Sequence, residues 1–270
     1  TAVSVAIAGV AGVGAHAAFA AQAVGPASSF AALAAYPCFA VTPADNPTLF
    51  YAFDEADGAA AVDSSPSVRT GGLQAGARRA AGSCLAGASP AITLDGTPSA
   101  QVLTGGPAIA APTDFSVELW FRTTSTTGGR LMGFGNAATG ESSRFDRHLY
   151  LTDDGRVVFG VHSLVLPHTA VSPQRYNDGA WHHVVATMER GTLGFGPGMR
   201  LYVDGSLVAS NANTVAQSTT GYWRLGYDGL SGWPSAPTTA AFTGGLDSVG
   251  VYGAPLTASQ VQAHYLRGRL

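Results

Sequence analysis

The sequence predicts an all-β protein whose main body, residues 48–270, is a two-sheet antiparallel jelly-roll sandwich. Short runs with alternating apolar and polar residues recur along this region, and Gly, Pro, Asp and Asn separate them. No helical period lies between these runs, and many short strands without intervening helices are typical of sandwiches and jelly rolls. Asp-Gly pairs between the runs favour tight turns, because both residue types tolerate a left-handed backbone.

The same patterns assign the individual elements. Strands are expected at Thr48–Phe53, Ala91–Leu94, Ser116–Thr123, Arg130–Phe134, His148–Leu151, Val157–His162, His182–Met188, Met199–Val203, Tyr222–Leu225 and Leu246–Tyr252. Tight turns are expected at Asp95-Gly96, Asp154-Gly155, Asp178-Gly179, Asp204-Gly205 and Asp228-Gly229. A last segment, Thr257–Leu266, has the spacing of one short helix.

The composition excludes several classes of protein. Of the 270 residues, 46% are apolar and 11% are charged, which is well below the usual quarter and is not the composition of a disordered chain. The net charge is -3, and no basic cluster provides an electrostatic surface for nucleic acid. All 14 basic residues are arginine, which favours a GC-rich bacterial genome as the source.

The first 44 residues contain no Asp, Glu, Lys or Arg, and residues 1–21 are apolar on every face. Three interpretations are open: the core of a signal peptide, a membrane anchor, which needs about 20 apolar residues, or a buried assembly element. We expect the assembly element, either as a helix that packs closely through small residues or as a strand donated to a neighbouring subunit. Gly25-Pro26 ends either structure. The expected organisation is an apolar assembly or anchor segment at 1–25, a linker at 26–47 and the sandwich at 48–270.

The expected contacts between subunits come from the larger apolar side chains of the first segment: Val3, Val5, Ile7, Val10, Val13 and Phe19. An uncharged apolar start before a β-domain resembles the layout of type IV pilin-like subunits. The stretch Ala17-Ala-Phe-Ala-Ala-Gln22 with Pro26-Ala-Ser-Ser-Phe30 resembles actinobacterial surface proteins with SipW-type signals, whose relatives build fibres by strand donation. Both resemblances imply a self-assembled surface filament that meets the membrane only as a precursor or through an anchor.

The two cysteines, Cys38 and Cys84, do not form a Cys-x-x-Cys pair, so zinc and redox motifs are weak interpretations. In an exported protein the simplest expectation is one disulfide between the linker and the sandwich. It would remove roughly 3–4 kcal/mol of chain entropy from the unfolded state. The alternative is two buried free thiols.

Several motifs in order resemble the bacterial laminin-G-like module of the concanavalin-A-like lectins and glucanases. They are Tyr51-Ala-Phe-Asp-Glu55, Gly58, Asp63-Ser-Ser65, Leu94-Asp-Gly96, Phe115-Ser-Val-Glu-Leu-Trp120, Asp178-Gly-Ala-Trp-His-His-Val184, Leu201-Tyr-Val-Asp-Gly205, Gly245-Leu-Asp-Ser-Val-Gly-Val-Tyr252 and Pro255-Leu-Thr-Ala-Ser-Gln-Val261 with Tyr265. The resemblance covers residues 48–270. It implies two stacked antiparallel sheets with a convex and a concave face.

Glycoside hydrolases share this fold and need two carboxylates that flank the scissile bond. Their usual motif, Glu-x-Asp-x-(x)-Glu on one strand, is absent. Glu118 lies on a predicted strand, but its neighbours on the same face are Ser116 and Trp120 rather than acids. No Gly-x-Ser-x-Gly motif supports a serine nucleophile. The sequence therefore predicts a protein that is not an enzyme.

The resemblance implies a structural calcium ion, with Asp54 and Asp247 as its carboxylate ligands, because calcium prefers six to eight oxygen ligands. The alternative is that both acids cap turns or accept backbone hydrogen bonds. His182 and His183 look like a metal site, but alternation along a strand places them on opposite faces. We expect Trp181 to be a packing residue and His182 to bind a nearby turn.

A glycan site would use exposed aromatic rings, and the candidates are Trp233, Tyr227 and Trp223, in or beside a Gly-rich region. The alternative is that these rings cover the core or pack on a neighbouring subunit. We expect a non-enzymatic extracellular protein of the cell surface, a filament subunit that polymerises through residues 1–25 and displays the sandwich. The alternative function is a free-standing secreted or membrane-anchored module that binds glycans or extracellular matrix.

Overall fold

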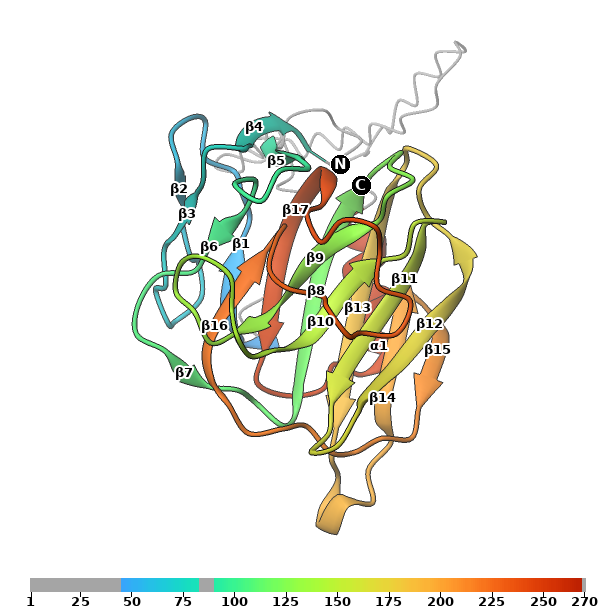
Figure 1. Cartoon of the computed structure of the whole chain (residues 1–270). Helices are drawn as coiled ribbons and strands as arrows, with labels where there is room; N and C mark the ends of the chain where they lie inside the picture. The colour runs from blue at the N-terminus through green and yellow to red at the C-terminus, as the bar shows by residue number, and fades with distance from the viewer. Residues whose placement is uncertain (1–44, 83–89, 269–270) are drawn as a thin grey trace, which may run out of the picture. The chain divides into compact units, whose positions relative to one another are not determined.

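The structure is a computed structural model and describes residues 45–82 and 90–268. Two antiparallel sheets lie face to face (Figure 1), which confirms the predicted sandwich. The apolar segment with its six expected assembly residues lies outside the described residues, and so do Cys38 and Cys84. No helix in the two described ranges is long and apolar enough to cross a membrane.

The first sheet has the strand order β15-β14-β13-β8-β17-β5-β4, and β1 pairs with β17. Its strands are β1 (Pro47–Tyr51), β4 (Ala77–Ala81), β5 (Pro90–Asp95), β8 (Phe115–Arg122), β13 (Trp181–Glu189), β14 (Gly198–Val203), β15 (Ser206–Asn211) and β17 (Thr243–Tyr252).

The second sheet has the order β12-β11-β10-β9-β16-β6-β3-β2, and β7 pairs with β16. Its strands are β2 (Ala60–Ala61), β3 (Gly71–Leu73), β6 (Val102–Leu103), β7 (Ile109–Ala110), β9 (Gly129–Gly135), β10 (Phe145–Leu151), β11 (Arg156–His162), β12 (Pro167–Arg175) and β16 (Thr220–Leu225). Each of the ten predicted strands has its counterpart in one of the two sheets, with ends that differ by at most three residues.

The core between the sheets follows from the alternation of side chains along each strand. On β8 the side chains of Phe115, Val117, Leu119 and Phe121 belong to the main core cluster. The intervening Ser116, Glu118, Trp120 and Arg122 therefore lie on the outer face of the first sheet. Each large apolar side chain that is fully buried in this core contributes roughly 1.5–3 kcal/mol to folding.

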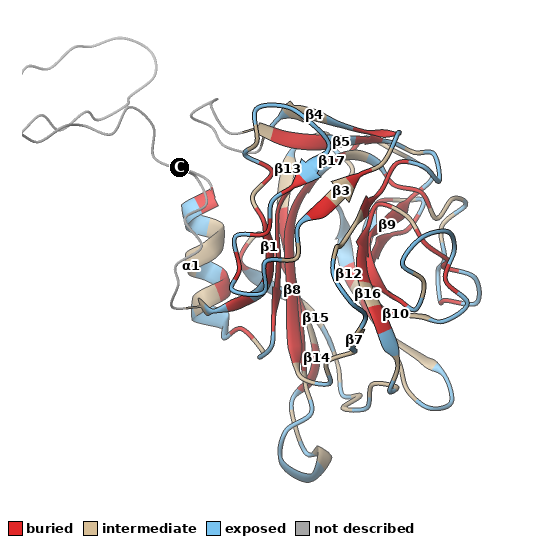
Figure 2. Cartoon of the chain, turned by 90° about the vertical axis from the view of Figure 1, so that its left-hand side faces the viewer, coloured by how far each residue is buried: buried red, intermediate tan, exposed pale blue. Residues whose placement is uncertain are grey.

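The predicted C-terminal helix is present as α1 (Ala258–Gly268) and covers part of this outer face (Figure 2). Its start is a capping box: Gln260 N–H donates to the Thr257 hydroxyl, and Thr257 N–H donates to the Gln260 side-chain oxygen. Leu256 and Val261 pack against Val185 and Tyr252 of the sheet.

The predicted Asp-Gly turns behave in two ways. Asp204 and Gly205 have φ angles of 50° and 76° and form the two-residue connection between β14 and β15. Two positive φ angles in succession are the geometry for which this dipeptide is favoured. The prediction is wrong for Asp228-Gly229, because Asp228 is fully buried in the connection between β16 and β17 and is held in an ion cluster.

Candidate functional site

An open groove of about 510 Å³ lies at one end of the outer face of the first sheet. Its volume is in the range of small-molecule sites. It is lined by hydroxyl side chains and glycine backbone, with one cation: Thr93, Arg122, Thr123, Thr124, Ser125, Thr126, Thr127, Gly179, Thr243, Gly244 and Gly245. Within this lining there is no carboxylate, so the groove cannot supply the acid pair of a glycoside hydrolase.

The β8–β9 loop, residues 123–128, forms one wall of the groove and is fixed by its own hydroxyl groups. Thr123 Oγ1 donates to the Thr243 carbonyl at 2.6 Å and accepts the Ser125 N–H at 2.9 Å. Ser125 Oγ accepts the Thr127 N–H, and Asn177 Nδ2 donates to the Ser125 carbonyl. Local hydroxyl-to-backbone bonds of this kind hold a turn without a helix or sheet ladder.

Two hydroxyls of this loop are left for a ligand. Thr124 and Thr126 are exposed, and their side chains form no hydrogen bond with any residue that the structure describes. A hydroxyl both donates and accepts, which matches the hydroxyl groups of a sugar. Because the rest of the loop is fixed, these two groups are presented in a preorganised geometry, which lowers the entropic cost of binding.

Three lining residues of the groove, Thr93, Gly245 and Arg122, belong to one row of cross-strand partners. Arg78 pairs with Thr93, Thr93 with Gly245, Gly245 with Arg122, and Arg122 with Trp181. Directly paired residues share a face of a sheet, so these five side-chain positions lie side by side on the outer face.

Glycine is required in the middle of this row, and Trp181 holds the neighbouring arginine. A Cβ atom at Gly245 would lie only 2.7 Å from the Trp181 ring. The Arg122 guanidinium lies 5.0 Å from the centre of that ring, a cation–π contact that fixes its direction. Arg78 and Arg122 are both exposed, and neither forms an ion pair with another described residue.

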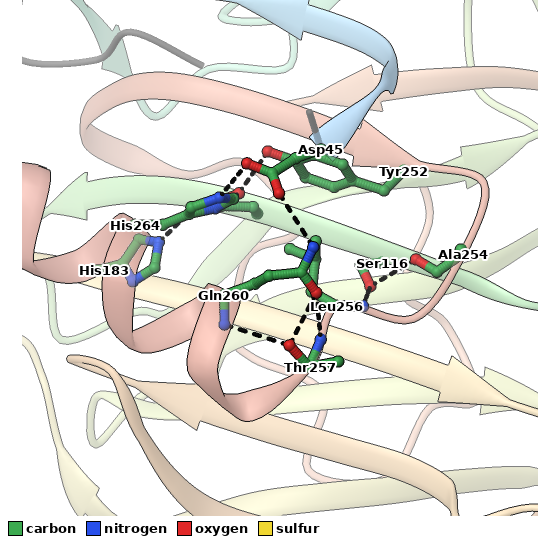
Figure 3. Close-up of polar contacts among 10 residues, drawn as sticks. Asp45, Ser116, His183, Tyr252, Ala254, Leu256, Thr257, Gln260 and His264 are labelled. Atoms are coloured by element: carbon green, nitrogen blue, oxygen red, sulfur yellow. Dashed lines mark hydrogen bonds and ion pairs between the residues drawn. The ribbon is translucent and has the colours of Figure 1, made fainter. Parts of the chain in front are cut away.

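A second group of polar residues lies deeper on the same sheet face, beneath α1 (Figure 3). Glu118 is its centre: His183 Nε2 lies 2.7 Å from Oε1, the Tyr252 hydroxyl donates to Oε2 at 2.7 Å, and His264 Nδ1 lies 3.0 Å from both oxygens. His264 Nε2 lies 2.9 Å from Asp45 Oδ2, and Gln260 Nε2 donates to Asp45 Oδ1. The two carboxylates therefore hold the His264 ring from both sides.

These contacts shift the protonation equilibria of the cluster. Burial disfavours a charged His264, but its hydrogen bonds and attraction to Glu118 and Asp45 outweigh burial and raise the pKa to about 9. Burial also disfavours the Glu118 carboxylate, yet the hydrogen bonds from His183 and His264 lower its pKa below the ordinary value. Burial, followed by the negative charge of Glu118, raises the pKa of Tyr252. The cluster is closed to solvent by α1, so it serves to fasten the helix to the sheet.

A third polar cluster lies on the outer face of the second sheet, beneath the β16–β17 connection. Asp228 Oδ2 lies 3.2 Å from Nη1 of Arg130 and 3.2 Å from Nη1 of Arg224, and all three side chains are fully buried. Arg224 also donates to Gln101 Oε1 at 2.7 Å. Burial lowers the pKa of Arg130 to about 10, although Asp228 partly offsets this effect. Two cations against one carboxylate leave this cluster with an excess positive charge.

The structure corrects two of the three aromatic residues expected to bind a glycan. Trp223 is 4% exposed and packs against Phe115 and Phe134 in the main core. Trp233 is 6% exposed and stands edge-on to His148, with ring centres 4.5 Å apart. Neither indole offers a face to a sugar, because both fill space that a sandwich must close. Tyr227 is half-buried, and it is not among the residues that line the groove.

The other expected sites have mixed outcomes. The β1–β17 ladder ends at the pair Tyr51 and Val249, and both Asp54 and Asp247 lie just beyond that end. Asp54 is exposed and Asp247 is buried. In the described residues no group of three or more Asp, Glu, His or Cys side chains is arranged to hold a metal ion. A calcium ion there would depend on backbone carbonyls and water, and it stays a prediction. His182 binds Asp178 and Asp204 of two turns at 3.1 and 2.8 Å, which confirms its expected role.

The groove was not predicted from the sequence, although the residues of its loop are recognisable there. Five consecutive hydroxyl residues, Thr123 to Thr127, follow Arg122 at the end of a predicted strand. Such a run is ordinary for a loop, and only the cross-strand register shows that it lies beside Arg78 and Trp181.

Comparison with known proteins agrees with this architecture. A laminin G family model, described as the Concanavalin A-like lectin/glucanases superfamily, matches residues 95–262, which is more than half of the chain. The chain therefore belongs to this family. Among curated proteins, none matches the sequence.

Solved structures with the same fold come from several kinds of protein. The binding domain of Paraclostridial Mosquitocidal Protein 1 has a TM-score of 0.60 at 14% identity, over 82% of this chain and 52% of that one. Domain 4 of AbnA, a GH43 extracellular arabinanase from Geobacillus stearothermophilus, in complex with arabinotriose, has a TM-score of 0.58 at 19% identity, over 82% and 98%. The Trypanosoma rangeli sialidase has a TM-score of 0.55 at 17% identity, over 85% and 35%. At these identities the likeness shows the fold alone, and the chain spans only about half of the first structure.

Proposed function

We propose that the sandwich is a non-enzymatic, extracellular carbohydrate-binding domain and that an oligosaccharide binds in the hydroxyl-lined groove. The groove itself carries the proposal, since it joins a preorganised loop, two unengaged hydroxyls and a fixed guanidinium in a space that suits a short glycan. Membership of a family that includes lectins supports it, and so does the likeness to a domain whose structure contains arabinotriose.

Arg122, which lines the groove, and Arg78, which pairs with the lining residue Thr93, point to a class of sugar. A guanidinium binds carboxylate, sulfate or phosphate through two parallel hydrogen bonds, which a neutral sugar cannot provide. With no acid in the groove lining to repel such a ligand, we expect glycans with carboxylate or sulfate groups to bind more tightly than neutral ones of the same length.

Isothermal titration with matched acidic and neutral oligosaccharides tests this function. The double variant Thr124→Ala/Thr126→Ala should weaken binding of both classes by at least about tenfold, which corresponds to one lost hydrogen bond for each hydroxyl. Arg122→Gln should selectively weaken acidic glycans. Thr220→Ala and Arg175→Gln, exposed residues of the second sheet, serve as controls. Equal binding by all variants would exclude the groove as the site.

A filament subunit is the finer function that the sequence predicts, and it concerns residues 1–25, which lie outside the described residues. The two proposals are compatible, because a filament formed by that segment would display the sandwich and its groove. Extracellular placement on a bacterial cell surface belongs to this same proposal.

A further inference from the structure

Exposed apolar side chains gather at the end of the sandwich opposite the groove. Of the ten large apolar residues that are exposed in the described ranges, six belong to three segments, residues 163–166, 191–197 and 212–219. The six are Leu164 (83% exposed), Val165 (83%), Leu166 (49%), Leu193 (88%), Phe195 (89%) and Val215 (46%). We call these three segments the apolar tips.

Hydrogen bonds show that the apolar tips are neighbours. Gln217 N–H donates to the His162 carbonyl at 2.8 Å, which places the third segment against the β11–β12 hairpin. Thr214 Oγ1 donates to the Gly194 carbonyl at 2.8 Å, which places the same segment against the β13–β14 loop. In both Figure 1 and Figure 2 the β13–β14 loop projects beyond the body of the sandwich.

The groove and the apolar tips occupy opposite ends of one strand. β13 begins at Trp181, the cross-strand partner of the groove residue Arg122, and ends at Glu189, just before the second apolar tip. Eight steps of about 3.3 Å separate the first and last residues of β13 by roughly 26 Å. A ligand at one end therefore leaves the other end accessible, and the inference below does not depend on the proposed glycan function.

No contact among the residues that the structure describes explains why these side chains are apolar. The three segments contain no Asp, Glu, Lys, Arg or His. Leu193 adopts a left-handed backbone with φ 54°, which is uncommon for leucine, and the turn that it forms (Thr192–Gly194) buries none of its residues. Exposed apolar side chains that gather on neighbouring loops mark an interaction site.

Shape and charge together select the partner. The exposed side chains stand at the ends of separate narrow loops, so a rigid protein partner would need a separate hole for each tip. A bilayer surface has no such requirement, because lipid rearranges around an apolar side chain that enters the headgroup region. Arg190, exposed at the base of the second tip, has its backbone N–H fixed by Asp114 at 2.7 Å and would lie at the level of lipid phosphates.

We propose that the apolar tips dock the sandwich on a lipid membrane surface, with Leu193 and Phe195 at the boundary of the acyl chains. The groove at the far end of β13 then faces away from the membrane.

The test uses the full chain. Residues 1–21 are apolar and could bind lipid on their own, so the readout must be specific to the apolar tips. Phe195→Trp places a fluorophore at the tip, whereas Trp120, Trp223 and Trp233 are buried and the half-buried Trp181 lies at the opposite end of β13. Vesicles of phosphatidylcholine brominated along the acyl chains should quench Phe195→Trp at least twofold more than the unchanged protein, since bromine quenches only at contact depth. Quenching equal to that of the unchanged protein would overturn the proposal even if the chain binds vesicles by another route.

Sedimentation with vesicles of phosphatidylcholine and phosphatidylglycerol gives a second readout. Leu193→Asp should lower the membrane affinity of the Phe195→Trp chain by at least about tenfold, because a carboxylate replaces a side chain that enters the interface. The control is Leu207→Asp, an exposed leucine (54%) at the groove end of β15, and it should leave affinity unchanged. The lipid-free protein is also tested for self-association. If it self-associates and Leu193→Asp abolishes this, the proposal is overturned, and the partner of the apolar tips is a second copy of the chain.

Discussion

Replacing His264 by Gln tests how α1 is held. The ring lies between two carboxylates, and its side chain is only 10% exposed. The pKa rises from 6.5 to about 9, which corresponds to about 3 kcal/mol of preferential stabilisation of the imidazolium at roughly 1.4 kcal/mol for each tenfold change in proton affinity. This stabilisation is similar to the roughly 3–5 kcal/mol of folding free energy that is lost when a buried ion pair is broken. At pH 7, His264→Gln should lower the free energy of unfolding by about 3 kcal/mol.

The raised pKa of His264 also predicts how the free energy of unfolding changes with pH. Because the folded pKa of His264 is raised, its stabilisation is fully present below about pH 6.5 and is lost as the pH rises through about 9. Glu118, with a lowered pKa, contributes stability that is present above its unfolded pKa and is lost as the pH falls. The unchanged protein should therefore lose stability between pH 6.5 and 9.5, and His264→Gln should show a much flatter profile there.

Urea unfolding followed by tryptophan fluorescence and far-ultraviolet circular dichroism measures both effects. His168→Gln, on the edge strand β12, is the matched histidine control and should keep the unchanged profile. If His264→Gln unfolds within 1 kcal/mol of the unchanged protein at pH 7 and with the same pH slope, the cluster does not fasten the helix electrostatically.

Four further predictions follow from the other sites. Asp228→Asn should lower the free energy of unfolding by about 3–5 kcal/mol, because it leaves Arg130 and Arg224 buried without a carboxylate. Arg130→Met leaves one arginine paired with Asp228 and should lower it by less than half as much, and chemical denaturation compares the two variants. Trp233→Ala should cost about 3–5 kcal/mol by denaturation and leave glycan affinity unchanged, since the ring is core rather than ligand platform. Val5→Asp should abolish filaments in electron micrographs while the circular dichroism of the sandwich is kept; normal filaments would refute the predicted role of residues 1–25. Calcium at a hundredfold excess over its dissociation constant should add about 2.7 kcal/mol to stability, and Asp247→Asn should remove that gain in thermal melts; no gain with the unchanged protein would exclude the ion.

The sequence predicted most of the longer strands and missed edge strands and strands of two or three residues. β8 and β13 were found because each carries a long apolar run in which every second side chain enters the core. β12 was missed because Pro167 and Pro173 interrupt it, and prolines are tolerated only where a strand has a free edge. β2, β6 and β7 have two residues each, which is too short for any period to be read.

The candidate sites were harder to predict because aromatic type does not decide exposure. Trp233 lies in a Gly- and Pro-rich loop, where exposure is the reasonable expectation, yet the ring sits over Gly160 at a distance that only glycine permits. Glu118 was correctly separated from any acid pair, but its partners His183, Tyr252 and His264 come from three other parts of the chain. Asp45, which binds the other side of His264, comes from a fourth. Pairings between residues more than sixty positions apart are set by sheet register, which a single sequence does not display.

The length of α1 decides which part of one sheet face stays open to solvent. Successive outward residues of β8 meet successive parts of the C-terminal segment: Ser116 accepts the Leu256 N–H, Glu118 binds His264, and Trp120 stacks on Tyr265. The eleven residues of α1 extend about 16 Å, and residues 116–120 of β8 extend about 14 Å, so α1 and the Leu256 that precedes it cover these three positions. Arg122, the next outward residue, is exposed and lines the groove. Covered positions of this face therefore became a closed ion network, and the first uncovered one keeps a free cation beside Trp181, where a ligand can reach it.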